Sequence, residues 1–201
     1  LILASASTAR RELLRAAGVP FVVKPSAVRE IQGRGRRLRD VVLSNARRKA
    51  IAVARRFPGR WVLGADTLIE FAGRIVGKPR TLKAAERLHV EMGGQWHRIA
   101  TGVCLVCGRE RRLLYVVSRV LVRRLDPSRL RRLYARRDPR GMAGGYAVER
   151  ARDPLIERVS GSFTNVLGLP MEAVLPLLEA RGLARKAGRS SRPAQARPLR
   201  R

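Results

Sequence analysis

Several residue types are scarce in this sequence, and each scarcity excludes a class of protein. Two cysteines are too few for a disulfide framework, so we expect a protein of the reducing cytoplasm. No apolar run approaches the roughly 20 residues of a membrane-spanning helix, and the three apolar residues at the start are too few for a signal peptide. Aromatic residues make up 4% of the chain, so leucine, valine, isoleucine and alanine must build the core.

Acidic residues are also few. The chain has 15 Asp and Glu against 44 Lys and Arg, for a formal net charge of +29. Only five of the cations are lysine and 39 are arginine, an imbalance that indicates a compositional bias as much as a selected surface. A field this positive attracts polyanions, whether nucleotides or nucleic acids, and does not distinguish between them.

Strand and helix signals alternate early in the chain, and strands pair as hairpins later. We expect strands at 1–4, 21–23, 96–106, 113–122 and 155–159, and within 61–79 a buried strand that breaks at 64–66 and a hairpin that turns at 72–73. We expect helices at 8–17, 40–57 with Asp40 as cap, 81–92, 127–135 and from 170 onward. This order predicts an α/β fold with a mixed twisted sheet and flanking helices.

The last part of the chain differs in composition from the rest. Residues 183–201 hold seven cations and two prolines but few apolar side chains. We therefore expect one domain over 1–182, followed by a basic, disordered tail.

A small set of polar residues interrupts apolar, turn-bounded stretches: Ser5, Ser7, Arg10, Glu30, Lys49, Asp66 and Lys78. Asp66 is the sharpest candidate, because it follows a buried strand and a Gly-Ala break, where the ligands of α/β sheets usually bind. An Asx turn to the backbone is the alternative, and the spacing alone leaves both open.

Arg10 and Arg11 raise a separate question. Both stand in the first turn of the first expected helix, where a cation opposes the helix dipole by roughly 0.3–1 kcal/mol when exposed. An anion bound at that helix start would offset this cost.

The order of short motifs resembles a known family. LASASTARRELL (3–14), ARRKA (46–50), GADT (64–67), GKP (77–79), TGV (101–103), AGGY (143–146) and NVLGLP (165–170) follow the order of the Maf-like nucleotide pyrophosphatases. The resemblance runs from residue 1 to about 178. It implies a fold related to inosine triphosphate pyrophosphatase, with a cleft between two lobes. It also implies hydrolysis of a nucleoside triphosphate to the monophosphate and pyrophosphate with a divalent metal, Mg²⁺ or Mn²⁺.

The resemblance also implies roles for individual residues. Asp66 would be the general base for the attacking water, and Glu30 and Asp66 would supply oxygen ligands to the metal. Ser7 and Arg10 would bind phosphate at the helix start, and Lys49 and Lys78 would act as point charges on the phosphates. Arg11 could equally be a solvated residue.

Three positions of the family's base selectivity disagree in this chain. Ala9 stands where dTTP/UTP-preferring members carry arginine, and Thr67 agrees with that type. Glu149 resembles the 7-methyl-GTP type, because a carboxylate accepts hydrogen bonds from a guanine edge. Arg150 and Arg152 replace the usual glycines, so this loop could differ in shape or the activity could be reduced. The base and the oligomeric state, including a homodimer, stay open.

Other protein classes account for less of the sequence. His89-Val90-Glu91 with Cys104 and Cys107 imitates a zinc deaminase motif, but the spacing is wrong and the cysteines fall on opposite faces of a strand. We interpret His89 as a helix-surface residue and His97 as structural. A charge-driven nucleic-acid-binding protein would explain +29 but not Asp66 and Glu30, and a catalytically degenerate relative is the remaining alternative.

Overall fold

A mixed β-sheet forms the centre of the computed structural model, which describes residues 1–33, 35–136, 138–140, 143–145 and 154–185. Its seven strands are β1 (Ile2–Leu3), β2 (Val22–Val23), β3 (Val62–Phe71), β4 (Arg74–Val76), β5 (Trp96–Cys107), β6 (Glu110–Val122) and β7 (Ile156–Ser160). The strand order is β2-β1-β3-β5-β6-β7, with β4 paired to β3. β1 runs parallel to β2 and β3, and all other pairs are antiparallel. The predicted mixed α/β sheet is confirmed.

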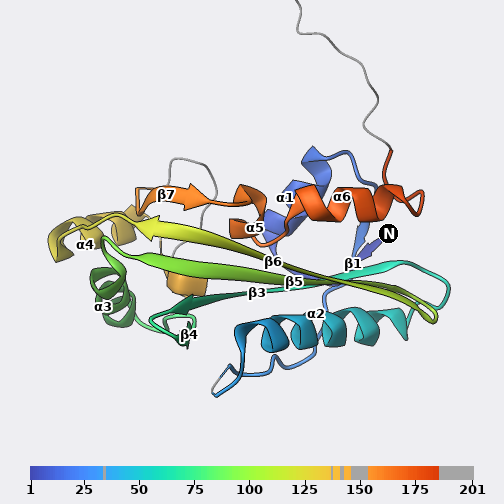
Figure 1. Ribbon diagram of the computed structural model, residues 1–201, viewed down its shortest axis with the longest axis horizontal. Coiled ribbons are helices and arrows are strands. Elements are labelled where there is room, and N and C mark those ends of the chain that lie inside the picture. Colours follow the sequence, from blue (N-terminus) through green and yellow to red (C-terminus); the bar gives the residue numbers. More distant parts are fainter. Residues whose placement is uncertain (34, 137, 141–142, 146–153, 186–201) are drawn as a thin grey trace, which may run out of the picture.

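Helices flank both faces of this sheet (Figure 1). α2 (Leu38–Ala54) packs along β3 and β5 on one face, and α1 (Thr8–Ala16), α5 (Phe163–Val166) and α6 (Met171–Glu179) lie on the other. α3 (Leu82–Met92) and α4 (Pro127–Arg136) pack together at one end of the long β5–β6 hairpin, with the short turn η1 (Ala143–Gly145) beside α3. The site described below lies where α2 meets β3.

Two of the four clusters of the described hydrophobic core lie on opposite sides of the sheet near β1 and β3. One cluster joins the sheet to α1 and α6 and includes Leu3, Leu14, Leu63, Leu169 and Leu178. The other lies against α2 and includes Ala46, Ala50, Val53 and Val62. The side chains on the α2 side are smaller, so this helix lies close to the strands.

Two glycines set how closely α2 approaches the sheet. A Cβ atom built on Gly64 of β3 would lie 2.5 Å from the carbonyl oxygen of Ala46, and one on Gly102 of β5 would lie 2.5 Å from that of Val42. Gly64 is therefore required by helix packing and does not mark a turn. The predicted break at 64–66 is wrong, because β3 runs unbroken from Val62 to Phe71.

Most helix boundaries follow the local signals in the sequence. Ser7 and Thr81 cap α1 and α3 through their side-chain oxygens, and the β3–β4 hairpin turns at Ala72-Gly73 as predicted, both with positive φ. The predicted cap at Asp40 is wrong. α2 begins at Leu38, so Asp40 lies in its first turn, where its charge favours the helix dipole.

The expected tail is described only at its start. Leu183 and Ala184 pack against the cluster of Leu3 and Leu178, so the chain is still in contact with the core at these residues. Residues 186–201 lie outside the described part of the chain.

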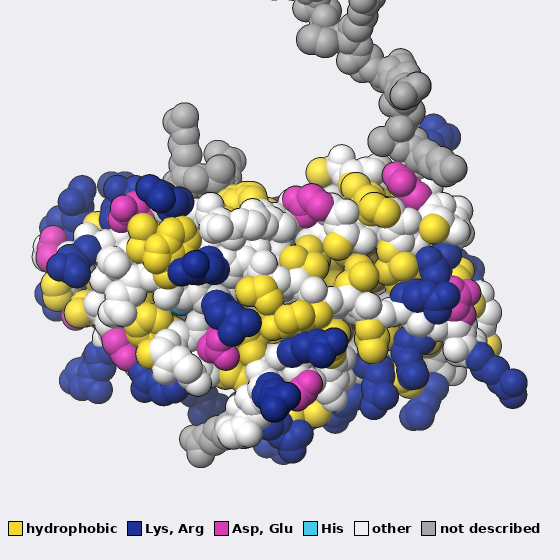
Figure 2. Space-filling view, in the orientation of Figure 1, with side chains coloured by type: hydrophobic (Ala, Val, Ile, Leu, Met, Phe, Trp, Pro, Cys, Tyr) yellow, Lys and Arg dark blue, Asp and Glu magenta, His cyan; other side chains and the backbone are white. Residues whose placement is uncertain are grey.

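Surface charge is spread rather than gathered. Figure 2 shows Lys and Arg side chains along the whole length of the visible face, with few Asp and Glu among them. Among the residues that the structure describes, no helix is both long and apolar enough to cross a bilayer.

Candidate active site

Asp66 occupies the middle of a central strand, not the edge of the sheet. It lies on β3 opposite Gly102 of β5 and is 3% exposed. The predicted position at a strand end is therefore wrong, because the glycine before it admits α2 instead of ending the strand. Since side chains alternate along a strand, Asp66 faces α2 while its neighbour Thr67 faces the opposite side.

Lys49 joins the two carboxylates that the sequence singled out. Its Nζ atom lies 2.7 Å from Oδ1 of Asp66 and 2.6 Å from Oε1 of Glu30. The Lys49 and Asp66 side chains are 12% and 5% exposed, whereas that of Glu30 is 42% exposed. The ammonium group therefore holds one buried and one open carboxylate at the same point.

Asn45 completes the surroundings of Asp66, and the sequence reasoning missed it. Its Nδ2 donates to Oδ2 of Asp66 at 3.0 Å, and its Oδ1 accepts from the backbone N–H of Ile31 at 2.8 Å. The signal was present. Asn45 lies four residues before Lys49 and is a polar residue on a helix face otherwise made of Val41, Val42, Ala46 and Ala50.

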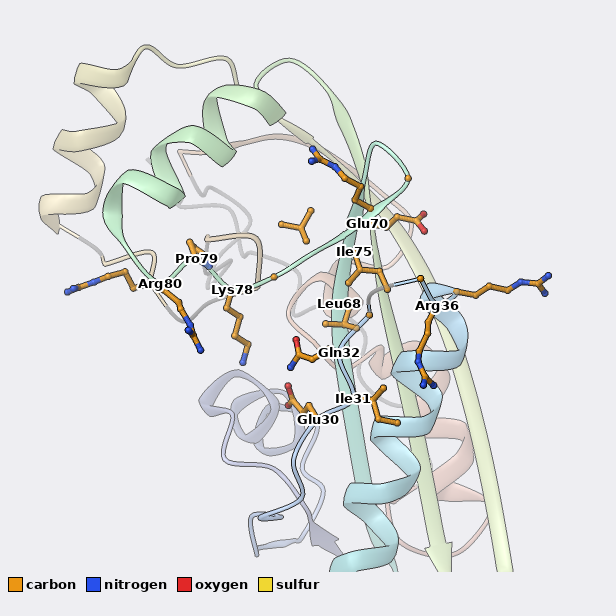
Figure 3. Close-up of a pocket in the computed structure, with 18 residues that line it drawn as sticks. Glu30, Ile31, Gln32, Arg36, Leu68, Glu70, Ile75, Lys78, Pro79 and Arg80 are labelled. Atoms are coloured by element: carbon orange, nitrogen blue, oxygen red, sulfur yellow. The ribbon is translucent and has the colours of Figure 1, made fainter.

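A pocket of about 1290 Å³ opens beside Glu30, between segment 30–37, the β3–β4 hairpin and segment 77–80. In Figure 3 the ends of the Glu30, Gln32 and Lys78 side chains point toward one another. Burial raises the pKa of Glu30, but the hydrogen bond from Lys49 and the charges of nearby cations outweigh it, so this pKa lies below its ordinary value. Glu30 is therefore ionised at neutral pH.

A second polar network lies on the opposite face of β3, around Arg10. Its Nε donates to the carbonyl of Gly168 at 2.8 Å, and its Nη2 donates to Oγ1 of Thr67 at 3.0 Å. Its Nη1 donates to Oγ of Ser5 at 3.1 Å and to the carbonyl of Ala65 at 3.0 Å. Among the described residues, protein atoms thus accept four of its five N–H groups, leaving one for a ligand.

This network answers the question of the two arginines. The Arg10 side chain turns inward and is 9% exposed, so backbone carbonyls and hydroxyls solvate its charge. Burial lowers the pKa of Arg10, although the carboxylates of Asp66 and Glu30 oppose the shift. Arg11 instead donates to Oγ1 of Thr8 at 2.8 Å, on the exposed side of α1.

The remaining predicted substrate-binding residues lie around these two networks. Ser7 caps α1, its Oγ accepting from the backbone N–H of Arg10 at 3.4 Å, and Ala9 is half-buried in the first turn. Oγ1 of Thr67 lies 2.9 Å from Oγ1 of Thr101, so this side chain already has partners within the fold. Glu149, with Arg150 and Arg152, lies outside the described residues.

His89 is not a helix-surface residue, and that prediction is wrong. It is 1% exposed, with Nδ1 2.6 Å from the Tyr134 hydroxyl and Nε2 2.9 Å from the carbonyl of Gly144. The carbonyl can only accept, so Nε2 carries the proton. Cys104 is buried, which raises the pKa of its thiol to about 11. Cys107 is half-buried.

Glu30 and Asp66 fit a divalent metal of the Mg²⁺ type. Both carboxylates lie within hydrogen-bonding distance of the same Lys49 atom, so their oxygens converge on one cationic group. Across the described ranges, no group of three or more His, Cys, Asp and Glu is placed to hold a metal. Two carboxylates suit an ion that completes its shell with waters and substrate phosphates.

The sequence matches a known family and named relatives over most of its length. The profile of a family described as "Maf-like protein" matches residues 1–181. The dTTP/UTP pyrophosphatase of Gloeobacter violaceus is 40% identical over 178 residues, covering 89% of this chain and 94% of the relative. Those of Thermomicrobium roseum and Myxococcus xanthus are 39% and 38% identical, covering 90% and 91% of this chain and 84% and 93% of the relatives.

Proposed function

This chain belongs to the Maf-like protein family, and from that membership we propose that it is a nucleoside triphosphate pyrophosphatase acting on dTTP and UTP. The relatives that share 38–40% identity over nine tenths of the chain carry that name. The observation that supports the proposal most is the Glu30–Lys49–Asp66 array beside a large pocket, because it offers carboxylates and a cation at one point.

In this proposal Asp66 is the general base. Each of its carboxylate oxygens accepts one hydrogen bond, from Lys49 or from Asn45, and keeps a second lone pair for the proton of a water. The water oxygen attacks the α-phosphorus as Asp66 takes its proton. The bond from this phosphorus to the α–β bridging oxygen breaks, its electron pair stays on the leaving pyrophosphate, and the nucleoside monophosphate remains.

Cations of the chain stabilise the charge on the phosphates. Lys78 is exposed at the pocket, with its side chain directed toward Glu30 (Figure 3). The free N–H of Arg10 and the capped helix start at Ser7 would contact the same polyphosphate. A divalent metal held by Glu30 and Asp66 would neutralise phosphate oxygens and orient them when bound.

Base selection is assigned to Ala9, Thr67 and Glu149. Thr67 favours a pyrimidine by family resemblance, in agreement with the names of the relatives, whereas Glu149 favours a 7-methylguanine base. We propose the pyrimidine preference, because the similarity to dTTP/UTP pyrophosphatases spans almost the whole chain, while the opposing signals are two residues: Ala9, which lacks the arginine of that type, and Glu149.

A nucleotide panel tests this function directly. The purified chain is incubated with dTTP, UTP, CTP, ATP, GTP and 7-methyl-GTP, each with Mg²⁺, Mn²⁺ or EDTA, and pyrophosphate release is measured. We expect turnover of dTTP and UTP with metal and none with EDTA. A preference for 7-methyl-GTP would overturn the pyrimidine assignment, and orthophosphate release or no turnover would overturn the pyrophosphatase.

A further inference from the structure

Helix α2 holds three consecutive residues of the loop that carries Glu30. Nη1 of Arg48 donates to the carbonyl of Arg29 at 3.0 Å, and Lys49 binds the Glu30 carboxylate. Asn45 binds both polar backbone atoms of Ile31, accepting from its N–H at 2.8 Å and donating to its carbonyl at 3.3 Å. Of these contacts, that of Arg48 fixes the backbone before the exposed carboxylate, and those of Asn45 fix both polar backbone atoms of the residue after it.

Asn45 is the most buried member of this set. It is 1% exposed and its amide is fully used, because Nδ2 donates its two hydrogens to Ile31 and to Asp66 while Oδ1 accepts from Ile31. Its neighbours on the α2 face are small apolar residues. An amide in such surroundings costs free energy unless it is paired, and both residues that pair with it belong to the site.

We propose that Asn45 is a positioning residue that couples the Glu30 loop to the Asp66 carboxylate, so that both carboxylates face one ligand. This inference rests on the proposed function for its catalytic consequence. Asn45 acts through Asp66 and Ile31, the two residues to which its amide hydrogen bonds run. One amide fixes Oδ2 of Asp66, and so the direction of Oδ1, and it also fixes the backbone one residue beyond Glu30. A change at Asn45 therefore acts on both carboxylates together.

Two substitutions separate the two contacts. Asn45→Leu has a similar volume, suits the apolar face and removes every hydrogen bond. Asn45→Asp keeps an acceptor for the Ile31 N–H but loses the amide nitrogen that donates to Asp66 and to the Ile31 carbonyl. Ser44→Ala serves as the matched control, because it removes a polar group from the adjacent, half-buried position on a different side of the same helix. Thermal melts establish that each variant is folded.

Three readouts are needed: the exchange rate of the Ile31 amide hydrogen without metal or nucleotide, the affinity for Mn²⁺ alone, and kcat and KM for UTP. For Asn45→Leu we expect Ile31 to exchange roughly tenfold faster, and Mn²⁺ affinity and kcat/KM to fall roughly 10–100-fold. For Asn45→Asp we expect near-normal Ile31 protection with kcat reduced at least about tenfold and KM changed less. Ser44→Ala should leave all three readouts within about twofold.

The inference fails if Asn45→Leu keeps the Ile31 protection, or loses it with wild-type Mn²⁺ affinity and turnover. Wild-type kcat in Asn45→Asp would overturn the link to Asp66. A wild-type chain that hydrolyses no nucleotide would instead overturn the proposed function. Ile31 exchange and Mn²⁺ affinity would then decide the coupling by themselves.

Discussion

The adjacent residues Asp66 and Thr67 of β3 belong to two polar networks on opposite faces of the strand, and these networks differ in how far they are open to solvent. On the α2 side of the strand, Lys49 binds the buried carboxylate of Asp66 and the exposed carboxylate of Glu30, which lies beside a pocket. On the Thr67 side, the guanidinium of Arg10 is surrounded by carbonyls and hydroxyls from Ser5 after β1, from β3 and from the Gly168 turn. The first network is open to solvent at one end, and the second is nearly closed.

This difference distinguishes side chains that can bind a ligand from side chains whose hydrogen bonds stabilise the fold. In the closed network almost every donor already has an acceptor, so removing Arg10 would leave buried acceptors unpaired and cost stability. In the open network the ionised Glu30 retains oxygens that a ligand can use. The two networks remain electrostatically connected, because Asp66 and Glu30 act on the pKa of Arg10.

The substitution Asp66→Asn tests most directly whether the open network contains the general base. The substitution keeps the shape and leaves Lys49 paired with Glu30, but it removes the basic oxygen. We expect pyrophosphate release from UTP to fall roughly 10²–10⁴-fold while the melting temperature stays close to that of the wild type. Near-normal turnover would mean that the base lies elsewhere and that the open network only binds.

Arg10→Met tests the closed network. It keeps the aliphatic stem but leaves the acceptors at Gly168, Ala65 and Thr67 without their donor. We expect the free energy of unfolding to drop by about 3 kcal/mol and the melting temperature by about 10 °C, measured by thermal denaturation. A variant that melts normally but has a KM for UTP raised more than tenfold would instead make Arg10 chiefly a phosphate ligand.

The smallest expected effect is the loss, at acidic pH, of the stability that the Glu30 ion pair contributes. Because the folded-state pKa of Glu30 lies below its ordinary value of 4.5, its ion pair stabilises the fold above that pH, and the contribution disappears as the pH falls through the lowered value. Wild type should melt about 1–2 °C above Glu30→Gln at pH 6, and the difference should shrink as the pH falls below 4.5. A gap that persists in acid would assign the stabilisation to packing.

Local signals in the sequence were enough to predict much of the fold. The helices expected from residues 8 and 81 begin at Thr8 and Leu82, and Ala72-Gly73 turns a hairpin, because each effect depends only on neighbouring residues. Motif order was enough to predict that Glu30, Lys49 and Asp66 share one site, and the structure places them in direct contact. The roles assigned to them remain predictions.

Effects that act between distant segments could not be predicted. Gly64 resembled a strand break because nothing nearby in the sequence reveals that the backbone of α2 lies against it. His89 has the spacing of a surface residue, but α4 and η1 cover it and supply its partners. Asn45 was overlooked because its importance comes from Ile31 and Asp66, 14 and 21 residues away.

The close approach of α2 to Gly64 and Gly102 has a consequence for how mutations in this chain will be interpreted. Neither glycine has a side chain that could meet a ligand, yet a methyl group at either would collide with helix backbone. The helix would have to lift, carrying Asn45 and Lys49 away from the strand. In a saturation mutagenesis screen for activity, substitutions at Gly64 and Gly102 would therefore abolish turnover as substitutions of catalytic residues do, although neither glycine contacts a ligand.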